Sequence, residues 1–247
     1  TDAPCSALSV LYTEEGEFLK YLFLKQNPNL VLVDTDMIVK APTRLLVAGM
    51  GDALATYFEA RACQATESET CAGGSATMTA VALAKLCYDT LIEKGELAKR
   101  AVDQNVSSKA VEKVIEANTL LSGMGFESGG LAGAHAIHNG FTVLPECHDV
   151  YHGEKVAFGT LVQLVLEDAH ELMKTLNFCK SVGLPTTLSQ LGIKEVTSEK
   201  IMAVAKAATV ETESIHHMPF KVTDKDVYDA IFTLDALGRD PMSYHAG

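Results

Sequence analysis

The spacing of apolar residues changes at Pro42, and this change constrains the fold more than any other feature of the chain. After Pro42 the apolar residues recur with helical spacing, whereas before it they cluster in short stretches of Leu, Val, Tyr and Phe separated by the turn-forming sequences TEEGE and KQNPN. This pattern predicts a β-hairpin and a third strand, followed by a mainly α-helical region. The three predicted strands cover residues 7–12, 18–24 and 30–34.

The chain after Pro42 predicts seven long helices and no extended sheet. Asn139-Gly140 and Gly183-Leu184-Pro185 are typical of helix ends, because Gly accepts the left-handed backbone that often follows a last turn and Pro cannot continue a helix. We therefore divide the chain into a β-strand region at 1–42 and a helical domain at 43–247. The predicted helices cover residues 44–64, 73–95, 108–127, 130–139, 154–167, 170–182 and 223–237.

Composition excludes several classes of partner. With 247 residues and 47% apolar content, the chain can bury a large core, and its net charge of −12 leaves little positive field for a nucleic acid. No apolar run approaches the roughly 18 residues that a membrane span needs, and no cationic segment followed by an apolar one opens the chain. The six cysteines lack any CxxC pair. We expect reduced thiols and a cytoplasmic protein that binds neither nucleic acid nor membrane.

Three residues that are far apart in the sequence form a candidate catalytic metal site. Asp52 has small and apolar neighbours in LLVAGMGDALATYFEA, which predicts burial, and a buried carboxylate is costly unless it is paired or bound to metal. His135 lies in GGLAGAHAIHNG, and His152 precedes a predicted helix start from which its ring would project into a cleft. One carboxylate and two imidazoles suit a catalytic metal, since three protein ligands leave a position for substrate or water.

Each of these residues also has an ordinary structural interpretation. Asp52 would serve equally well as a helix cap or as the partner of an arginine. His135 and His138 lie three residues apart on one helix face, where a histidine among apolar residues is commonly a hydrogen-bonded core residue. The surrounding Gly and Ala residues favour a site, because they let another backbone or a flat ligand approach closely.

Four blocks of sequence, TDAPCSALSV, GMGDALATYFEA, GFESGGLAGAHAIHNG and YHGEKVAFGTL, closely resemble glycerol dehydrogenases of the iron-type (group III) alcohol dehydrogenase superfamily. The resemblance spans essentially the whole chain. It implies the C-terminal all-helical domain of the iron-type alcohol dehydrogenase and dehydroquinate synthase-like fold, preceded by a short β-hairpin remnant of the NAD-binding α/β domain. It also implies that Asp52, His135 and His152 bind a divalent metal, which is zinc in the glycerol branch.

The chain departs from the wider superfamily at two positions. Many iron-type members have a fourth ligand, a histidine one helical turn after the aspartate, where this chain has Thr56. Many also have HxxxH where this chain has His135-Ala-Ile-His138. Zn²⁺ tolerates a three-ligand site with an open position, so we expect Zn²⁺ rather than Fe²⁺.

The resemblance assigns further residues to substrate and cofactor. Asp2, Phe126 and His135 match positions that contact the polyol, although an aspartate before Pro4 is also common in turns. Ser6, Leu8 and Tyr12 match positions that line bound NAD. The glycine-rich phosphate-binding turn of the family would lie ahead of residue 1, and no GxGxxG motif occurs here. We therefore expect either a fragment or a chain that has lost much of its cofactor site.

The resemblance implies reversible NAD-dependent oxidation of glycerol, or a related vicinal diol, to dihydroxyacetone. A metal would polarise the substrate hydroxyl for hydride transfer, and His138 or a chain of waters would carry the proton outward. Two alternatives stay open: a metal-binding helical oligomerisation fragment without activity, and a dehydroquinate synthase-like lyase. The lyase lacks support, since no Lys- and Arg-rich pocket for a phosphorylated, carboxylated substrate is evident. The resemblance also implies a homo-oligomer.

Overall fold

The computed structural model describes residues 3–14 and 18–240, and within these ranges the chain is mainly α-helical with one antiparallel hairpin. This confirms the predicted fold class. The hairpin consists of β1 (Leu8–Tyr12) and β2 (Phe18–Phe23). The helices are α1 (Thr35–Ile38), α2 (Thr43–Thr66), α3 (Met78–Val102), α4 (Lys109–Glu116), α5 (Ser122–Gly129), α6 (Gly133–Phe141), α7 (His152–Leu166), α8 (Leu172–Val182), α9 (Ser198–Ala208) and α10 (Asp224–Arg239).

The predicted third strand is wrong. Residues 30–34 are irregular and run outside the hairpin, and the described sheet has only the strands β1 and β2. Leu30 and Leu32 alternate with other residues as they would in a strand, but they are 77% and 88% exposed. An extended segment needs a neighbouring strand to satisfy its backbone, and none in the described residues lies beside this one.

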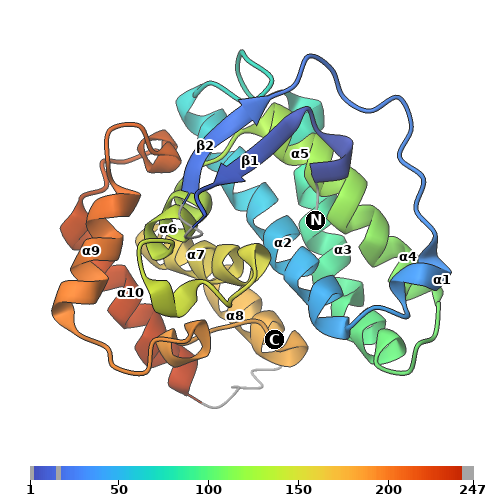
Figure 1. Ribbon diagram of the computed structural model, residues 1–247. Helices are drawn as coiled ribbons and strands as arrows, with labels where there is room; N and C mark the ends of the chain where they lie inside the picture. The colour runs from blue at the N-terminus through green and yellow to red at the C-terminus, as the bar shows by residue number, and fades with distance from the viewer. Residues whose placement is uncertain (1–2, 15–17, 241–247) are drawn as a thin grey trace.

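Helix α2 is the centre of the helical part. Most of its residues are buried on every side, as expected for a helix surrounded by others, and it packs against α3, α5 and α7. Figure 1 shows α3, α4 and α5 on one side of α2 and α6, α7, α9 and α10 on the other. The core between these helices includes the fully buried side chains of Met50, Phe58, Leu91, Phe141 and Phe158.

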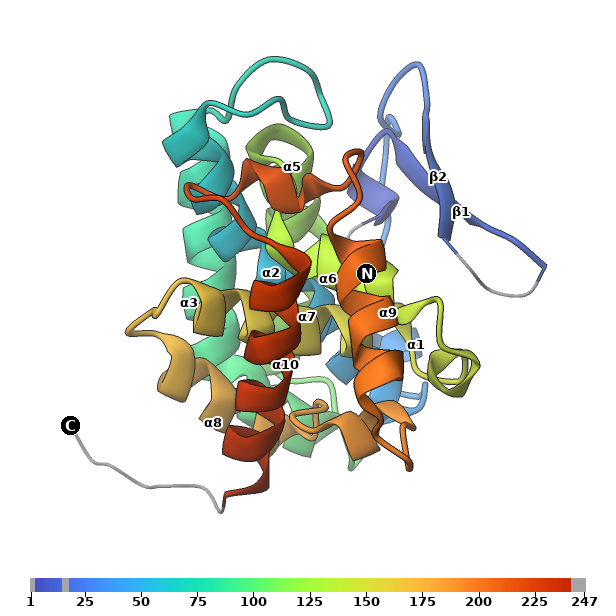
Figure 2. The same ribbon diagram turned by 90° about the vertical axis from the view of Figure 1, so that its left-hand side faces the viewer.

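The hairpin lies at the edge of the helices and stands away from them along much of its length (Figure 2). Its base is attached to the region after α4. Leu8 packs in a small cluster with Phe126 and Leu131, and the backbone N–H of Ala7 donates to the Glu127 carboxylate over 2.6 Å. These contacts place β1 on the wall of the cleft that contains the candidate site.

Side-chain caps explain several helix starts. Thr77, Ser108, Thr197 and Thr223 each accept a hydrogen bond from the first turn of α3, α4, α9 and α10, respectively. Helix α9 is absent from the seven predicted helices, although Thr197 is a typical cap. The predicted helix at 108–127 is divided into α4 and α5 by a π-helical segment, Ala117–Leu121, in which the backbone hydrogen bonds span five residues instead of four.

Four short 3₁₀ segments connect the larger elements: Ala3–Cys5, Pro145–Cys147, Leu188–Leu191 and Ser214–His217. The predicted end of one helix at Gly183 is confirmed, since Gly183 follows α8 with a left-handed φ of 85°. All six cysteines are free thiols, as predicted. Among the described helices, none is both long and apolar enough to cross a membrane.

Candidate metal centre

Asp52, His135 and His152 come together from three helices. Asp52 lies in the middle of α2, His135 in the first turn of α6, and His152 is the first residue of α7. One ligand atom from each residue lies within 4.8 Å of the other two. The Asp52 Oδ1 atom is 3.1 Å from Nε2 of His152 and 3.7 Å from Nε2 of His135. The predicted convergence of these three residues is therefore confirmed by the structure.

Helices α2 and α7 approach so closely that their backbones touch beside the site. A β-carbon added to Gly153 would lie 1.9 Å from the carbonyl oxygen of Ala48. Only glycine fits at such a distance. This contact brings the first turn of α7, and with it His152, against the turn of α2 that carries Asp52.

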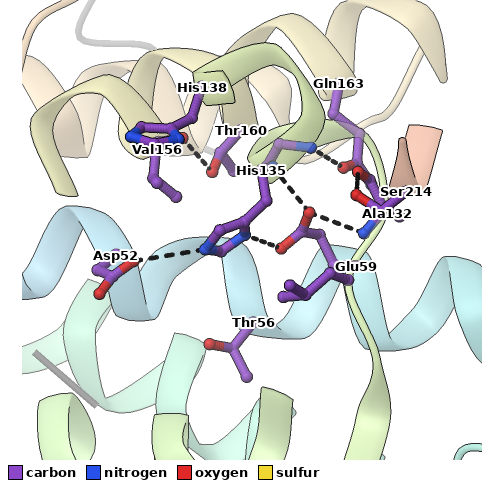
Figure 3. A network of polar contacts seen from close by, with 12 residues as sticks. Asp52, Thr56, Glu59, Ala132, His135, His138, Val156, Thr160, Gln163 and Ser214 are labelled. Carbon is purple, nitrogen blue, oxygen red and sulfur yellow. Dashed lines mark hydrogen bonds and ion pairs between the residues drawn. The ribbon is translucent and has the colours of Figure 1, made fainter. Parts of the chain in front are cut away.

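The start of α6 is fixed by side chains from other elements, because α6 has no capping side chain of its own. The Glu59 Oε1 atom accepts hydrogen bonds from the backbone N–H groups of Ala132 and His135, over 2.8 and 2.9 Å. Gln163 accepts from the N–H of Ala134 over 2.9 Å, and the Ser214 hydroxyl donates to the carbonyl of Ala132 over 2.6 Å. Figure 3 shows these side chains around the first turn of α6.

Glu59 also contacts the His135 ring. Its Oε2 atom lies 2.6 Å from the His135 Nδ1 atom, and the Glu59 side chain is fully buried (Figure 3). Glu59 was not predicted as a site residue. Its position contains a usable signal, since it lies seven residues after Asp52 and therefore two helical turns along the same face of α2. A histidine that binds metal through one ring nitrogen usually donates from the other to such a carboxylate.

His152, the second candidate histidine ligand, is the first of several residues joined by polar contacts from the cleft into the helical part. His152 Nδ1 lies 3.0 Å from His138 Nε2 and 3.2 Å from the Tyr12 hydroxyl. His138 Nδ1 lies 3.0 Å from Asn139 Oδ1, and the Asn139 amide nitrogen donates to both carboxylate oxygens of Glu213, over 3.2 and 3.1 Å. His138 is thus a buried neighbour of the candidate ligands, and Asn139 and Glu213 were not predicted as site residues.

The electrostatics of the group follow from burial and from these contacts. Burial alone would raise the pKa of Asp52, but the charge of His152 and the closeness of both imidazoles hold it well below its usual range. Burial would lower the pKa of His135, yet the Glu59 charge and the bonds to Asp52 and Glu59 raise it well above normal. Burial and the nearby His152 lower the pKa of His138. Without metal, the site therefore favours an anionic Asp52 beside a cationic His135.

A cleft of about 630 Å³ opens onto this group. Its walls include Asp52, His135 and His152 together with the predicted cofactor and substrate residues Ser6, Leu8, Tyr12 and Phe126. Burial and the charge of Asp52 raise the pKa of Tyr12 to about 12, so its hydroxyl stays protonated. Asp2, predicted to contact the substrate, lies outside the described residues.

The geometry fits a divalent metal. Asp52 Oδ1 is buried and has no hydrogen-bond partner in the described structure, although two imidazole nitrogens face it. A buried carboxylate oxygen without a partner is costly, whereas a cation between these three atoms would satisfy it. Carboxylate oxygen and imidazole nitrogen are ordinary ligands of Zn²⁺.

Thr56 lies at the position where the sequence resemblance implies a fourth ligand in many superfamily members. In this structure its side chain packs against α5 instead. Its hydroxyl contacts the Ser122 hydroxyl over 2.8 Å, and the residue is almost fully buried. On its other side, a β-carbon added to Gly125 would lie 2.7 Å from the Thr56 methyl group. The space around residue 56 is therefore filled, and within the described structure the candidate ligand set consists of Asp52, His135 and His152.

No family model matches the chain. An iron-containing alcohol dehydrogenase from Thermotoga maritima has the same fold, with a TM-score of 0.64 at 18% identity over 94% of this chain and 60% of that one. The helical fold is thus that of the iron-type alcohol dehydrogenases.

Two more similar proteins define the family. Glycerol dehydrogenase of Citrobacter freundii is 59% identical over 241 residues, which cover 97% of this chain and 66% of that protein. The structure of a probable glycerol dehydrogenase from Sinorhizobium meliloti superposes with a TM-score of 0.94 at 48% identity, over 97% of this chain and 68% of that one. The chain belongs to the glycerol dehydrogenase family, as its sequence blocks predict, and spans about two thirds of the length of these relatives.

Proposed function

We propose that the chain contributes the metal-holding part of an active site that oxidises glycerol to dihydroxyacetone with NAD. Asp52, His135 and His152 are the proposed ligands of a Zn²⁺ ion. The observation that carries this proposal is the buried Asp52 Oδ1 atom, which has no hydrogen bond and faces two imidazole nitrogens at 3.1 and 3.7 Å. Membership of the glycerol dehydrogenase family supports both the reaction and its reversibility.

When bound, Zn²⁺ supplies Lewis acidity, which lowers the pKa of a coordinated alcohol. The residues of the chain hold and orient the reactants around that chemistry. His135 lies on the cleft wall, and Phe126 presents an apolar surface to the carbon skeleton of a small polyol. We propose that Asp2 binds a second hydroxyl of the substrate. Related vicinal diols would fit the same arrangement.

We further propose that Ser6, Leu8 and Tyr12 contact the nicotinamide end of NAD. All three line the cleft that contains the candidate ligands, so a cofactor against β1 would lie beside the substrate. This arrangement supports the division of the chain into a part of the NAD-binding domain at 1–42 and a helical metal-binding domain at 43–247. A homo-oligomer and a cytoplasmic location remain predictions from the sequence.

Metal analysis of the purified chain, combined with a zinc titration against a chromophoric chelator, tests the ligand assignment. We expect one Zn²⁺ per chain, and we expect His152→Ala to lose it. His170 is a suitable control, since its side chain is 91% exposed and the residue follows the end of α7. His170→Ala should bind zinc like the wild type, and a His152→Ala variant that retains both zinc and activity would exclude the assignment.

Calorimetric titration with NAD and a glycerol oxidation assay on the same preparation separate the proposed enzyme from its main alternative. Zinc binding together with NAD-dependent glycerol oxidation supports the enzyme. Zinc binding without NAD binding or turnover would favour the metal-binding helical fragment, or an activity that requires residues outside this chain. The dehydroquinate synthase-like alternative gains no support, because the described cleft is lined by no lysine or arginine.

A further inference from the structure

We infer that two acidic residues, the buried Glu59 and the partly buried Glu213, are positioning residues that keep both candidate ligand imidazoles in the tautomer with hydrogen on Nδ1. Each Nε2 atom then presents its lone pair toward Asp52. The consequence for metal binding rests on the function proposed above. The assignment of the tautomers rests on the contacts alone. It can be tested in metal-free protein at a pH above the raised pKa of His135, where that ring is neutral.

Glu59 determines the tautomer of His135 directly. Its Oε1 atom is held by two backbone N–H groups, those of Ala132 and His135, which can only donate. This leaves Oε2 facing His135 Nδ1 over 2.6 Å. An ionised carboxylate can only accept, so the hydrogen of this bond belongs to Nδ1. In the neutral ring the Nε2 atom therefore keeps a free lone pair.

Glu213 determines the tautomer of His152 through two intermediates. Both of its oxygens accept from the Asn139 amide nitrogen, so the Asn139 Oδ1 atom must face His138. That oxygen accepts from His138 Nδ1, and the neutral His138 ring then has an accepting Nε2 atom.

His152 must accordingly donate to His138. The His152 Nδ1 atom lies 3.0 Å from His138 Nε2, and only a hydrogen on His152 Nδ1 can fill this bond. His138 is 1% exposed, and its two ring nitrogens contact an amide and another imidazole, an environment that disfavours a charged ring. The Tyr12 hydroxyl oxygen is close enough to share the same hydrogen.

The opposite tautomer would close the candidate site. A hydrogen on Nε2 would face the Asp52 carboxylate, which lies 3.1 Å from Nε2 of His152 and 3.7 Å from Nε2 of His135, and that nitrogen would no longer be available to a cation. Glu59 and Glu213 come from α2 and from the segment before the 3₁₀ turn Ser214–His217, so two separate parts of the fold determine one property of the site.

Glu59→Gln tests the role of Glu59 most directly, because the new side chain should reverse the tautomer of the His135 ring rather than weaken the preference for it. The two backbone N–H groups still require an oxygen, so the new amide nitrogen must face His135 Nδ1. That nitrogen donates, and the His135 hydrogen should move from Nδ1 to Nε2. We expect ¹⁵N chemical shifts of metal-free protein, at a pH where the ring is neutral, to report this exchange. We also expect zinc dissociation constants about 10- to 100-fold higher.

Glu171→Gln is the matched control for Glu59→Gln. Glu171 is also a largely buried carboxylate, 13% exposed, but it pairs with Arg61 at the start of α8. The control should lose thermal stability without any change in the His135 tautomer or the zinc constant. A folded Glu59→Gln protein with hydrogen still on His135 Nδ1 would overturn the role of Glu59, whatever its activity.

A pair of Asn139 variants tests the second branch. Asn139→Asp still offers an acceptor to His138 Nδ1, and one proton shared between the new carboxyl group and Glu213 takes the place of the amide donor. The His152 tautomer and the zinc constant should therefore stay near those of wild type. Asn139→Ala removes the acceptor and should release His138, which raises the zinc dissociation constant and gives a mixture of His152 tautomers. Equal zinc constants and equal ¹⁵N shifts in the two variants would overturn the role of the Glu213 branch. If wild type binds no zinc, the proposed function fails, while the tautomer measurements still decide this inference.

Discussion

Gly51 and Gly153 face each other across the contact between α2 and α7, and neither position has room for a side chain. A β-carbon added to Gly51 would lie 2.3 Å from the carbonyl oxygen of Gly153. Asp52 and His152 are the immediate neighbours of these glycines in the sequence. The close contact of the two backbones therefore determines the distance between two of the candidate metal ligands.

Gly153→Ala should separate α2 from α7. The new methyl group would overlap the Ala48 carbonyl oxygen, which cannot rotate away, so the helices must move apart. We expect a loss of about 1–3 kcal/mol in the free energy of unfolding and a weaker zinc site. Urea denaturation and zinc titration measure the two effects. Gly73→Asn is the control, because Gly73 has a left-handed φ of 82° in open space and asparagine tolerates that conformation.

Thr56→His should not add a fourth metal ligand. An imidazole at this buried position would collide with α5 at Gly125 and remove the contact between the Thr56 and Ser122 hydroxyls. We expect destabilisation by about 1–3 kcal/mol and no gain in affinity for Fe²⁺. Thr56→Ser keeps the hydroxyl and should lose less stability. Tighter binding of Fe²⁺ by a stable Thr56→His protein would contradict this account.

The stability of the protein should fall as the pH rises above about 8.5, where unfolded thiols ionise. Burial raises the pKa of Cys179 to about 12. A group whose pKa is higher in the folded state stabilises the protein fully at pH values below its unfolded pKa. This stabilisation is lost as the pH rises toward the folded pKa. Each pH unit in this window should cost up to ~1.4 kcal/mol per buried thiol. Denaturation curves between pH 7 and 10 should fall less steeply for Cys179→Ala, and equal slopes would exclude a contribution from Cys179.

Removal of Arg61 should destabilise the contact between α2 and the end of α7. Arg61 bonds to Glu167 and Glu171, whose side chains are only 11% and 13% exposed. Arg61→Met would leave two largely buried carboxylates without their cation, and we expect a loss of about 3 kcal/mol. Arg61→Lys should recover part of it, because an ammonium keeps the charge but not the two-pronged geometry. Thermal denaturation of the three proteins checks this order.

Local patterns were sufficient to predict most helices but not all of their boundaries. The predicted ranges of α2, α7 and α10 agree with the observed helices within a few residues. Helices α2 and α7 are long apolar runs that are buried on most sides, whereas α10 has its apolar residues on one face. Helix α9 was missed despite its Thr197 cap. The third strand was wrong because the alternation of Leu30 and Leu32 says nothing about a partner strand, and a strand requires one.

The kind of fold and the residue types available for a metal can be predicted from the sequence. The change of apolar spacing at Pro42, and the presence of a carboxylate and two imidazoles in Gly- and Ala-rich surroundings, are local properties that can be read along the chain. How these residues meet depends on tertiary contacts. Glu59 on α2 contacts His135, and Glu213 before the turn at Ser214 contacts Asn139 on α6. These hydrogen bonds join residues far apart in the sequence, and no local sequence pattern predicts them. The fold brings the candidate ligands together because such contacts form only between packed helices.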